Sequence, residues 1–195
     1  MGVIKTALEI ALERTESVNG DKSSINQFEA KQKGKKLANS FLSGEVDIDS
    51  ELKKADKKDL DCIKTGIFGI LAAQIALPSV KEDMDRFKKL GKGFEAIIKD
   101  PSFPAMFNQL VQLFSQYLQE ASHCEQMIRQ QYAPKLRQKE EELSRRLGRE
   151  IHIDPFQDPE FTGFYNQHMN ALKTNYEPVI EQAREETRKM FFKED

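Results

Sequence analysis

The fold of this chain is decided by residues 102–147, which read SFPAMFNQLVQLFSQYLQEASHCEQMIRQQYAPKLRQKEEELSRRL. A helix tolerates proline in its first turn, so Pro104 fits and Pro134 is the only helix breaker within the stretch. The stretch therefore predicts one helix of about 45 residues, about 67 Å long. A compact protein of 195 residues is only about 40 Å across. We expect this helix to protrude or to fold back at Pro134.

Apolar residues line one face of this predicted helix. They alternate steps of three and four through three heptads, which is the spacing of a coiled-coil seam. The seam consists of Phe107, Leu110, Phe114, Tyr117, Ala121, Cys124 and Ile128. Beyond it, steps of four insert a stutter at Pro134 before Leu143 and Leu147 resume the face. The pattern predicts a second helix packed along this seam.

That second long helix is expected to start at Asp158-Pro159-Glu160, where a cap, a first-turn proline and an acidic residue follow one another. Its apolar seam consists of Phe161, Tyr165, His168, Leu172, Tyr176, Val179, Ala183 and Met190. Two helices joined by about ten residues pack antiparallel, so residues 101–195 are predicted to form a long helical hairpin. Pro134 and Pro178 are predicted to lie at similar heights above its tip and to act as a shared hinge.

Residues 1–100 are predicted to form the body of a helical bundle, in one folding unit with the hairpin. Apolar periodicity and end signals delimit the expected helices. These are residues 3–18, ending at Asn19-Gly20, residues 23–42, a short charged helix capped by Asp49 or Ser50, residues 60–77, and an amphipathic helix near residues 84–98. The predicted fold class is all-α, a helical bundle with an antiparallel, coiled-coil-like hairpin in the C-terminal half.

The predicted helix over residues 60–77 has an edge of small residues. The edge consists of Cys62, Gly66, Gly69 and Ala73, at spacings of four, three and four. An interior glycine costs a helix about 1 kcal/mol relative to alanine, so a compensating contact is expected. We predict that a neighbouring helix approaches closely along this edge.

Charged residues make up 32% of the chain, with 30 basic residues against 32 acidic ones. This near balance leaves no broad basic surface, so a nucleic-acid partner is not expected. Cys62 and Cys124 lack metal-site spacing, which favours buried thiols in a reducing compartment. The first residues lack the apolar core of an export signal, and no uncharged stretch is long and apolar enough to span a membrane. We predict a cytoplasmic protein without a transmembrane segment.

No catalytic, cofactor-binding or metal-binding residue is predicted. Glu120 and His123 have the Glu-x-x-His spacing of a di-iron site, which needs a second copy. At the only other helical histidine, His168, Tyr165 occupies the place of the glutamate. Cys124 follows His123 directly, and adjacent helical residues point about 100° apart, so His123 cannot easily serve as the base of a cysteine nucleophile. Enzymatic activity is not expected.

Two further features predict interaction surfaces. Residues 101–119 carry no charge, and their polar face consists of Gln109, Gln112, Gln116 and Gln119. An amide face can be buried without the desolvation cost of ions, so we expect it inside the bundle or at a self-association surface. Ile151, Ile153 and Phe156 lie at the hairpin tip, where a protruding turn should be polar. We expect this tip either to dock a partner or to fold back onto the body.

The stretch Ala7-Leu8-Glu9-Ile10-Ala11-Leu12-Glu13-Arg14-Thr15 resembles the start of small uncharacterised bacterial all-helical proteins. The resemblance covers this N-terminal segment alone and implies a bacterial cytoplasm but no activity. The residues themselves predict a non-enzymatic helical scaffold or protein–protein interaction module, with self-association into a homo-oligomer as one form of the hypothesis. The alternative is a protein that binds an anionic surface, nucleic acid or membrane, through the basic residues of 129–149.

Overall fold

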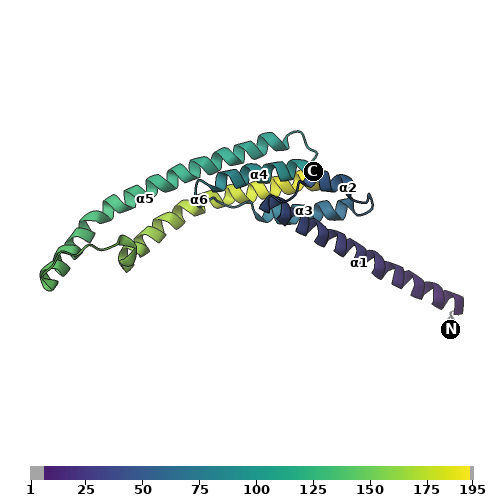
Figure 1. Ribbon diagram of the computed structural model, residues 1–195, viewed down its shortest axis with the longest axis horizontal. Helices are drawn as coiled ribbons and strands as arrows, with labels where there is room; N and C mark the ends of the chain where they lie inside the picture. The colour runs from purple at the N-terminus through teal and green to yellow at the C-terminus, as the bar shows by residue number, and fades with distance from the viewer. Residues whose placement is uncertain (1–6, 194–195) are drawn as a thin grey trace, which may run out of the picture. The chain divides into compact units, whose positions relative to one another are not determined.

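The structure, a computed structural model, describes residues 7–193, with side chains from Ser24 onward. The described residues form six α-helices, one 3₁₀ turn and no strand, which confirms the predicted all-α class (Figure 1). In chain order the elements are α1 (Ala7–Ser43), α2 (Ile48–Lys54), α3 (Leu60–Ala73), α4 (Asp83–Ile97), α5 (Phe103–Leu147), η1 (Pro155–Gln157) and α6 (Pro159–Phe192). The expected helical start at Val3 and Ile4, and the first residues considered for an export signal, lie outside the described residues.

Two compact units share these helices. Unit 1 comprises Met1–Gln74, Lys89–Phe103 and Arg188–Asp195, and unit 2 comprises Ile75–Lys88 and Pro104–Thr187. Helices α4, α5 and α6 each contribute residues to both units. The predicted division of the chain at residue 100 remains a prediction.

Unit 1 is built on a crossing of α1 and α3 in which the two backbones touch. A Cβ atom added to Gly34 would lie 2.0 Å from the carbonyl oxygen of Ile63, and one added to Gly66 would lie 2.2 Å from that of Lys31. Only glycine, which has no Cβ, fits at these two positions. The predicted close approach is therefore confirmed at Gly66. It is wrong at Gly69, where an added Cβ would meet nothing within 4 Å.

The rest of the unit 1 core is largely aromatic. Phe68 of α3 stacks on Phe191 with ring centroids 4.4 Å apart and meets Phe94 of α4 edge-on at 5.9 Å. Leu90 and Phe94 are fully buried, as the amphipathic pattern of residues 84–98 predicts. The apolar face of α4 at Leu90 and Phe94 is therefore buried in the core of unit 1.

Two predicted helix boundaries in the first 60 residues are wrong. Helix α1 continues through Asn19-Gly20, because the cost of one interior glycine, about 1 kcal/mol, is too small to end a helix by itself. Helix α2 begins after Asp47 rather than after Asp49 or Ser50. The Asp47 carboxylate caps α2 by accepting the Ser50 N–H at 3.0 Å.

Helix α3 ends at Ala73, short of the predicted end. The next turn fails because its backbone groups bond elsewhere in unit 2. The Ile75 carbonyl accepts a hydrogen bond from the Arg184 Nε–H of α6 at 2.9 Å. In a continued helix the Ser79 N–H would donate to the Ile75 carbonyl. It donates instead to the Asp83 carboxylate at 2.7 Å.

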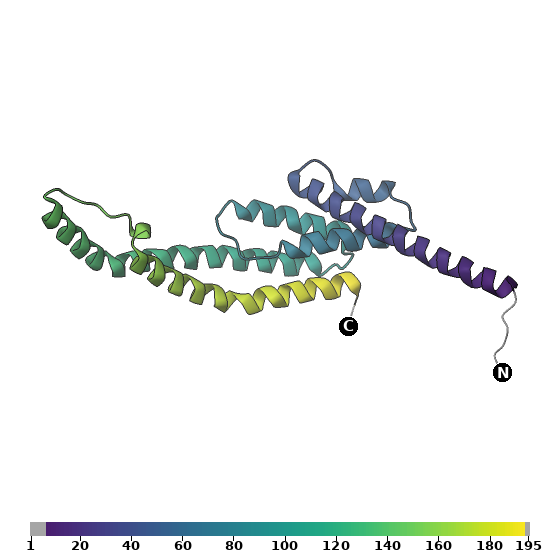
Figure 2. The ribbon, with the colours of Figure 1, turned by 90° about the horizontal axis from the view of Figure 1, so that it is seen from below.

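Helices α5 and α6 pack together along unit 2 as the predicted C-terminal hairpin (Figures 1 and 2). The rings of Tyr132 and Phe161 lie 5.2 Å apart, and those of Tyr117 and Tyr176 lie 5.0 Å apart. The order of these contacts shows that the two helices run antiparallel. The buried seam residues of α5 are Phe107, Leu110, Phe114, Tyr117, Ile128 and Tyr132.

The seam of α6 differs from the prediction at four positions. His168 is exposed and Val179 is 39% exposed, whereas Ile180 and Thr187 are buried. The prediction followed the apolar residues and omitted Thr187, whose hydroxyl is polar. In the helix this hydroxyl donates to the Ala183 carbonyl at 2.7 Å, so Thr187 can be buried without an unpaired polar group.

Pro134 and Pro178 do not lie at similar heights, and that prediction is wrong. Helix α6 begins beside Tyr132 rather than at the end of α5, so Pro134 lies near the start of α6. Pro178 lies just beyond the contact between Tyr117 and Tyr176, about 22 Å along the hairpin from the contact at Tyr132. Helix α5 is continuous through Pro134. The hinge role of the two prolines remains a prediction.

Candidate functional site

The segment between α5 and α6, residues 148–157, is called here the tip loop. Gly148 ends α5 with a φ of 65°, a backbone conformation that favours glycine. The loop then returns along α5 instead of projecting from it. The Ile151 N–H donates to the Ser144 Oγ and the Ile153 N–H to the Glu140 Oε1, both at 2.9 Å. Two alternate backbone amides therefore tie the loop to the last turns of α5.

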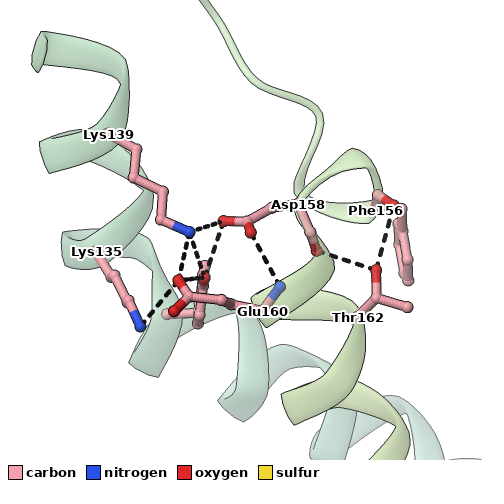
Figure 3. A network of polar contacts seen from close by, with 7 residues as sticks. Lys135, Lys139, Phe156, Asp158, Glu160 and Thr162 are labelled. Carbon is pink, nitrogen blue, oxygen red and sulfur yellow. Dashed lines mark hydrogen bonds and ion pairs between the residues drawn. The ribbon is translucent and has the colours of Figure 1, made fainter. Parts of the chain in front are cut away.

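At the foot of the tip loop, five side chains from the two helices form the anchor cluster (Figure 3). Its members are Tyr132, Lys135 and Lys139 of α5, with Asp158 and Glu160 at the start of α6. Lys139 Nζ lies 2.6 Å from Asp158 Oδ2 and also bonds to Glu160. The Tyr132 hydroxyl donates to Asp158 Oδ2 at 2.8 Å. The cluster sets the point at which α6 meets α5.

Asp158 also caps α6. Its Oδ1 accepts the Glu160 N–H at 3.0 Å, which satisfies an amide that the helix itself leaves unpaired. Its carbonyl accepts the Thr162 hydroxyl at 3.1 Å, and the same hydroxyl lies 3.2 Å from the Phe156 carbonyl (Figure 3). Asp158 is only 6% exposed, so a single buried carboxylate joins the cap, the loop and α5.

The electrostatics of the anchor cluster favour the charged forms of Asp158, Glu160 and Lys139, and the neutral form of Tyr132. The hydrogen bond from Lys139 is the main cause that lowers the pKa of Asp158, and Lys139 with Lys135 lowers the pKa of Glu160. The pKa of Lys139 is raised, first by its bond to Asp158. Burial is the largest cause that raises the pKa of Tyr132. The carboxylates and the ammonium group bond one another, which favours a positioning role over general acid or base chemistry.

The lowered pKa of Asp158 predicts an acid-dependent stability. Because the folded-state pKa lies below the ordinary value of 3.8, the ionised Asp158 stabilises the fold fully above that value. This stabilisation is lost as the pH falls through the folded-state pKa. We expect the Asp158→Asn variant to be less stable than the wild type at neutral pH, and the difference to shrink below pH 3.8. Urea denaturation at a series of pH values measures it, and a difference independent of pH would contradict the assignment.

The tip loop keeps apolar side chains at the surface. The Phe156 ring lies 5.2 Å from the rings of Phe161 and Tyr165, and the Arg129 guanidinium lies 5.2 Å from its centroid. Phe156 nevertheless remains 45% exposed. Ile151 and Ile153 are half-buried. The predicted docking residues are thus on one loop, and their docking role remains a prediction.

Leu147, which the sequence pattern places in the seam, is 57% exposed at the end of α5. Two hollows flank the tip loop, with volumes of about 360 and 460 Å³. Leu143 and Ile153 line the first, and Ile151 and His152 line the second. Leu147, Ile151, Ile153 and Phe156 are called the tip surface below.

The Glu-x-x-His pair is not assembled into a larger site. The Glu120 carboxylate accepts the Gln116 amide at 3.0 Å and bonds to the Tyr176 hydroxyl, while His123 is exposed. Burial, followed by the bond to Glu120, raises the pKa of Tyr176 to about 12. Within residues 7–193 no group of three His, Cys, Asp or Glu side chains is arranged to hold a metal ion. Cys124 is a free, half-buried thiol.

Together these features define a class of all-helical protein with a long C-terminal hairpin and a tip loop held by a buried carboxylate. Residues 49–189 match the Family of unknown function (DUF6657), and the chain belongs to this family. No curated protein and no solved structure matches the chain. The matched residues include the anchor cluster and the tip loop, whereas the resemblance at residues 7–15 lies outside them.

A test for membrane spans gives a negative result for the described part of the chain. None of its helices is both long and apolar enough to cross a bilayer.

Proposed function

We propose that this protein is a non-enzymatic, bacterial cytoplasmic scaffold or adaptor that binds a protein partner through the tip surface. The observation that carries the proposal is the combination of exposed apolar side chains with a loop that hydrogen bonds hold in place. Leu147 and Phe156 are 57% and 45% exposed, while the Ile151 and Ile153 amides are tied to α5. These apolar side chains are distributed over about 27 Å of the hairpin end, from Leu147 to the contact between Phe156 and Arg129, and exposed apolar side chains of this size are typical of interaction sites.

The fixed backbone of the tip loop supports this proposal energetically. Ordering a loop on binding costs conformational entropy, and a loop already held in one conformation avoids much of this cost. The anchor cluster fixes one end of the loop at Asp158, and Glu140 and Ser144 fix its middle. Most residues that line the two hollows beside the loop are charged or polar, so the hollows fit polar groups at the rim of a partner.

The alternative, binding of an anionic surface through residues 129–149, has less support. Four of the seven basic residues in this range already pair with carboxylates, namely Arg129, Lys135, Lys139 and Arg145. Paired cations have less charge to offer to phosphate groups. If this alternative applies, binding to anionic vesicles or to nucleic acid should weaken as salt is raised.

The tip proposal is tested by placing a charge on the tip surface. We expect Leu147→Asp and Ile151→Asp to retain the helical circular dichroism spectrum and to reduce partner binding by at least about tenfold, because a buried unpaired carboxylate disrupts an apolar contact. The measurement is quantitative affinity capture from the native organism, followed by titration of the captured partner. Val80→Asp is the matched control, since Val80 is 51% exposed and lies outside the tip. Equal capture by all three variants and the wild type would exclude the tip as the docking site.

A further inference from the structure

A second surface of unit 2 lies on the uncharged half of α5. A groove of about 300 Å³ runs between α5 and α6 there. Met106, Leu113 and Val179 contribute apolar side chains to it, and Gln109 and Gln182 contribute amides. The only charged residue in its lining is Glu186, which accepts the Gln182 amide at 2.9 Å. This surface is therefore apolar at its centre and neutral around most of its edge.

The glutamine face of residues 101–119 is not buried within the chain. The prediction that this face lies inside the bundle is therefore wrong. Gln109, Gln112, Gln116 and Gln119 are all exposed, because the buried seam of α5 faces the opposite direction. The prediction of burial inside the bundle considered only the cost of burying amides. The alternative, a self-association surface, agrees with this exposure.

We propose that this face binds a second copy of the same chain as a two-fold symmetric dimer. In such a dimer each surface meets an identical surface, so like groups come together. Like charges would repel, whereas a glutamine amide carries both donors and an acceptor and can pair with another glutamine. From Phe103 to Gln119 the helix carries no charged residue and four glutamines. Its surface can therefore pair with an identical surface.

The spacing of the glutamines specifies an antiparallel register. Gln109 and Gln116 are seven residues apart and so lie on the same face of α5. A two-fold axis between Gln112 and Leu113 places Gln109 opposite the partner's Gln116, and the reverse pair forms on the other side of the axis. Leu113, next to the axis, then lies over the groove of the partner.

The area of the face agrees with a weak dimer. The part of α5 from residue 104 to residue 121 is about 27 Å long, and two adjacent helices are about 20 Å wide. The face therefore buries about 540 Å² per copy, or about 1,100 Å² in total. A biological interface needs about 1,000 Å² of total buried area. We expect an equilibrium between monomer and dimer that depends on concentration.

Charge pairs at the two glutamines test the dimer and its register. The variant Gln109→Lys/Gln116→Lys places lysine opposite lysine both in this antiparallel register and in a parallel pairing of the two helices in register, and we expect its dimer dissociation constant to rise at least tenfold. The variant Gln109→Lys/Gln116→Glu places lysine opposite glutamate only in the antiparallel register, so its dimer should persist and become sensitive to salt. Both positions are exposed in the monomer, so circular dichroism should show an unchanged fold.

Sedimentation equilibrium over about a hundredfold range of concentration gives the dissociation constants. A wild type that remains monomeric throughout would overturn the proposal, as would a dimer that the double lysine variant does not weaken. Dissociation of both variants would overturn the antiparallel register. None of these outcomes affects the tip surface, because the tip variants contain no change between residues 104 and 121.

Discussion

Replacing Gly66 by alanine is expected to lower the free energy of unfolding by about 3 kcal/mol, because the new methyl group cannot be accommodated. Its Cβ would lie 2.2 Å from the carbonyl oxygen of Lys31. That neighbour is backbone, so relief requires α1 and α3 to move apart. For a chain of this length the loss corresponds to a fall in melting temperature of about 6–12 °C. Thermal and urea denaturation followed by circular dichroism measure it.

Gly69→Ala is the matched control within the same helix. An added Cβ at Gly69 meets nothing within 4 Å, so the substitution should raise stability by about 0.5–1 kcal/mol through helix propensity alone. Opposite signs at two glycines three residues apart would establish the helix crossing. Equal effects of the two substitutions would show that α1 and α3 do not touch at Gly66.

Replacing Asp158 by alanine is expected to have the second largest effect, a loss of about 3 kcal/mol. The change removes the cap of α6, worth about 1 kcal/mol, and buried bonds to a charged group, worth about 1.5–3 kcal/mol. It also leaves the hydroxyl of Tyr132 and the ammonium group of Lys139 without their shared acceptor. Urea denaturation measures the overall loss.

Hydrogen exchange shows whether this loss reaches the tip loop. If Asp158 anchors the loop, the Ile151 and Ile153 amides should exchange faster in the Asp158→Ala variant than in the wild type. Lys135→Ala is the control. The side chains of Lys135 and Glu160 are both more than half exposed, so their ion pair contributes little to stability. A variant at Asp158 that retained wild-type stability and exchange would show that the cluster does not hold the loop.

Much of the hairpin is predictable because its signals are local. The periodic seam of α5 and the capping sequence Asp158-Pro159-Glu160 are readable within a few turns, and α5 and α6 begin within one residue of the expected positions. The length of α5 followed from the absence of any helix breaker other than Pro134 between the first-turn Pro104 and Gly148. Local preferences of this kind do not depend on the rest of the chain.

The candidate site was predictable only in part. The sequence marked Ile151, Ile153 and Phe156 because apolar residues are unexpected in a protruding turn. It did not reveal the anchor cluster, since Tyr132 and Lys139 meet Asp158 across the hairpin. Charged residues spaced along a helix are usually solvated. The spacing of Lys135 and Lys139 does not show whether their ammonium groups contact a buried carboxylate or water.

The sequence by itself determined the all-α class, the two long helices and their antiparallel packing, because apolar periodicity, caps and a short connection act between near neighbours in the chain. Only the tertiary structure decided the register of the hairpin, the carboxylate that holds the tip loop and the contact of Gly34 with α3. Each of these depends on where one helix stops along another. Helical periodicity repeats every turn, so it identifies the face that packs but not the position along it.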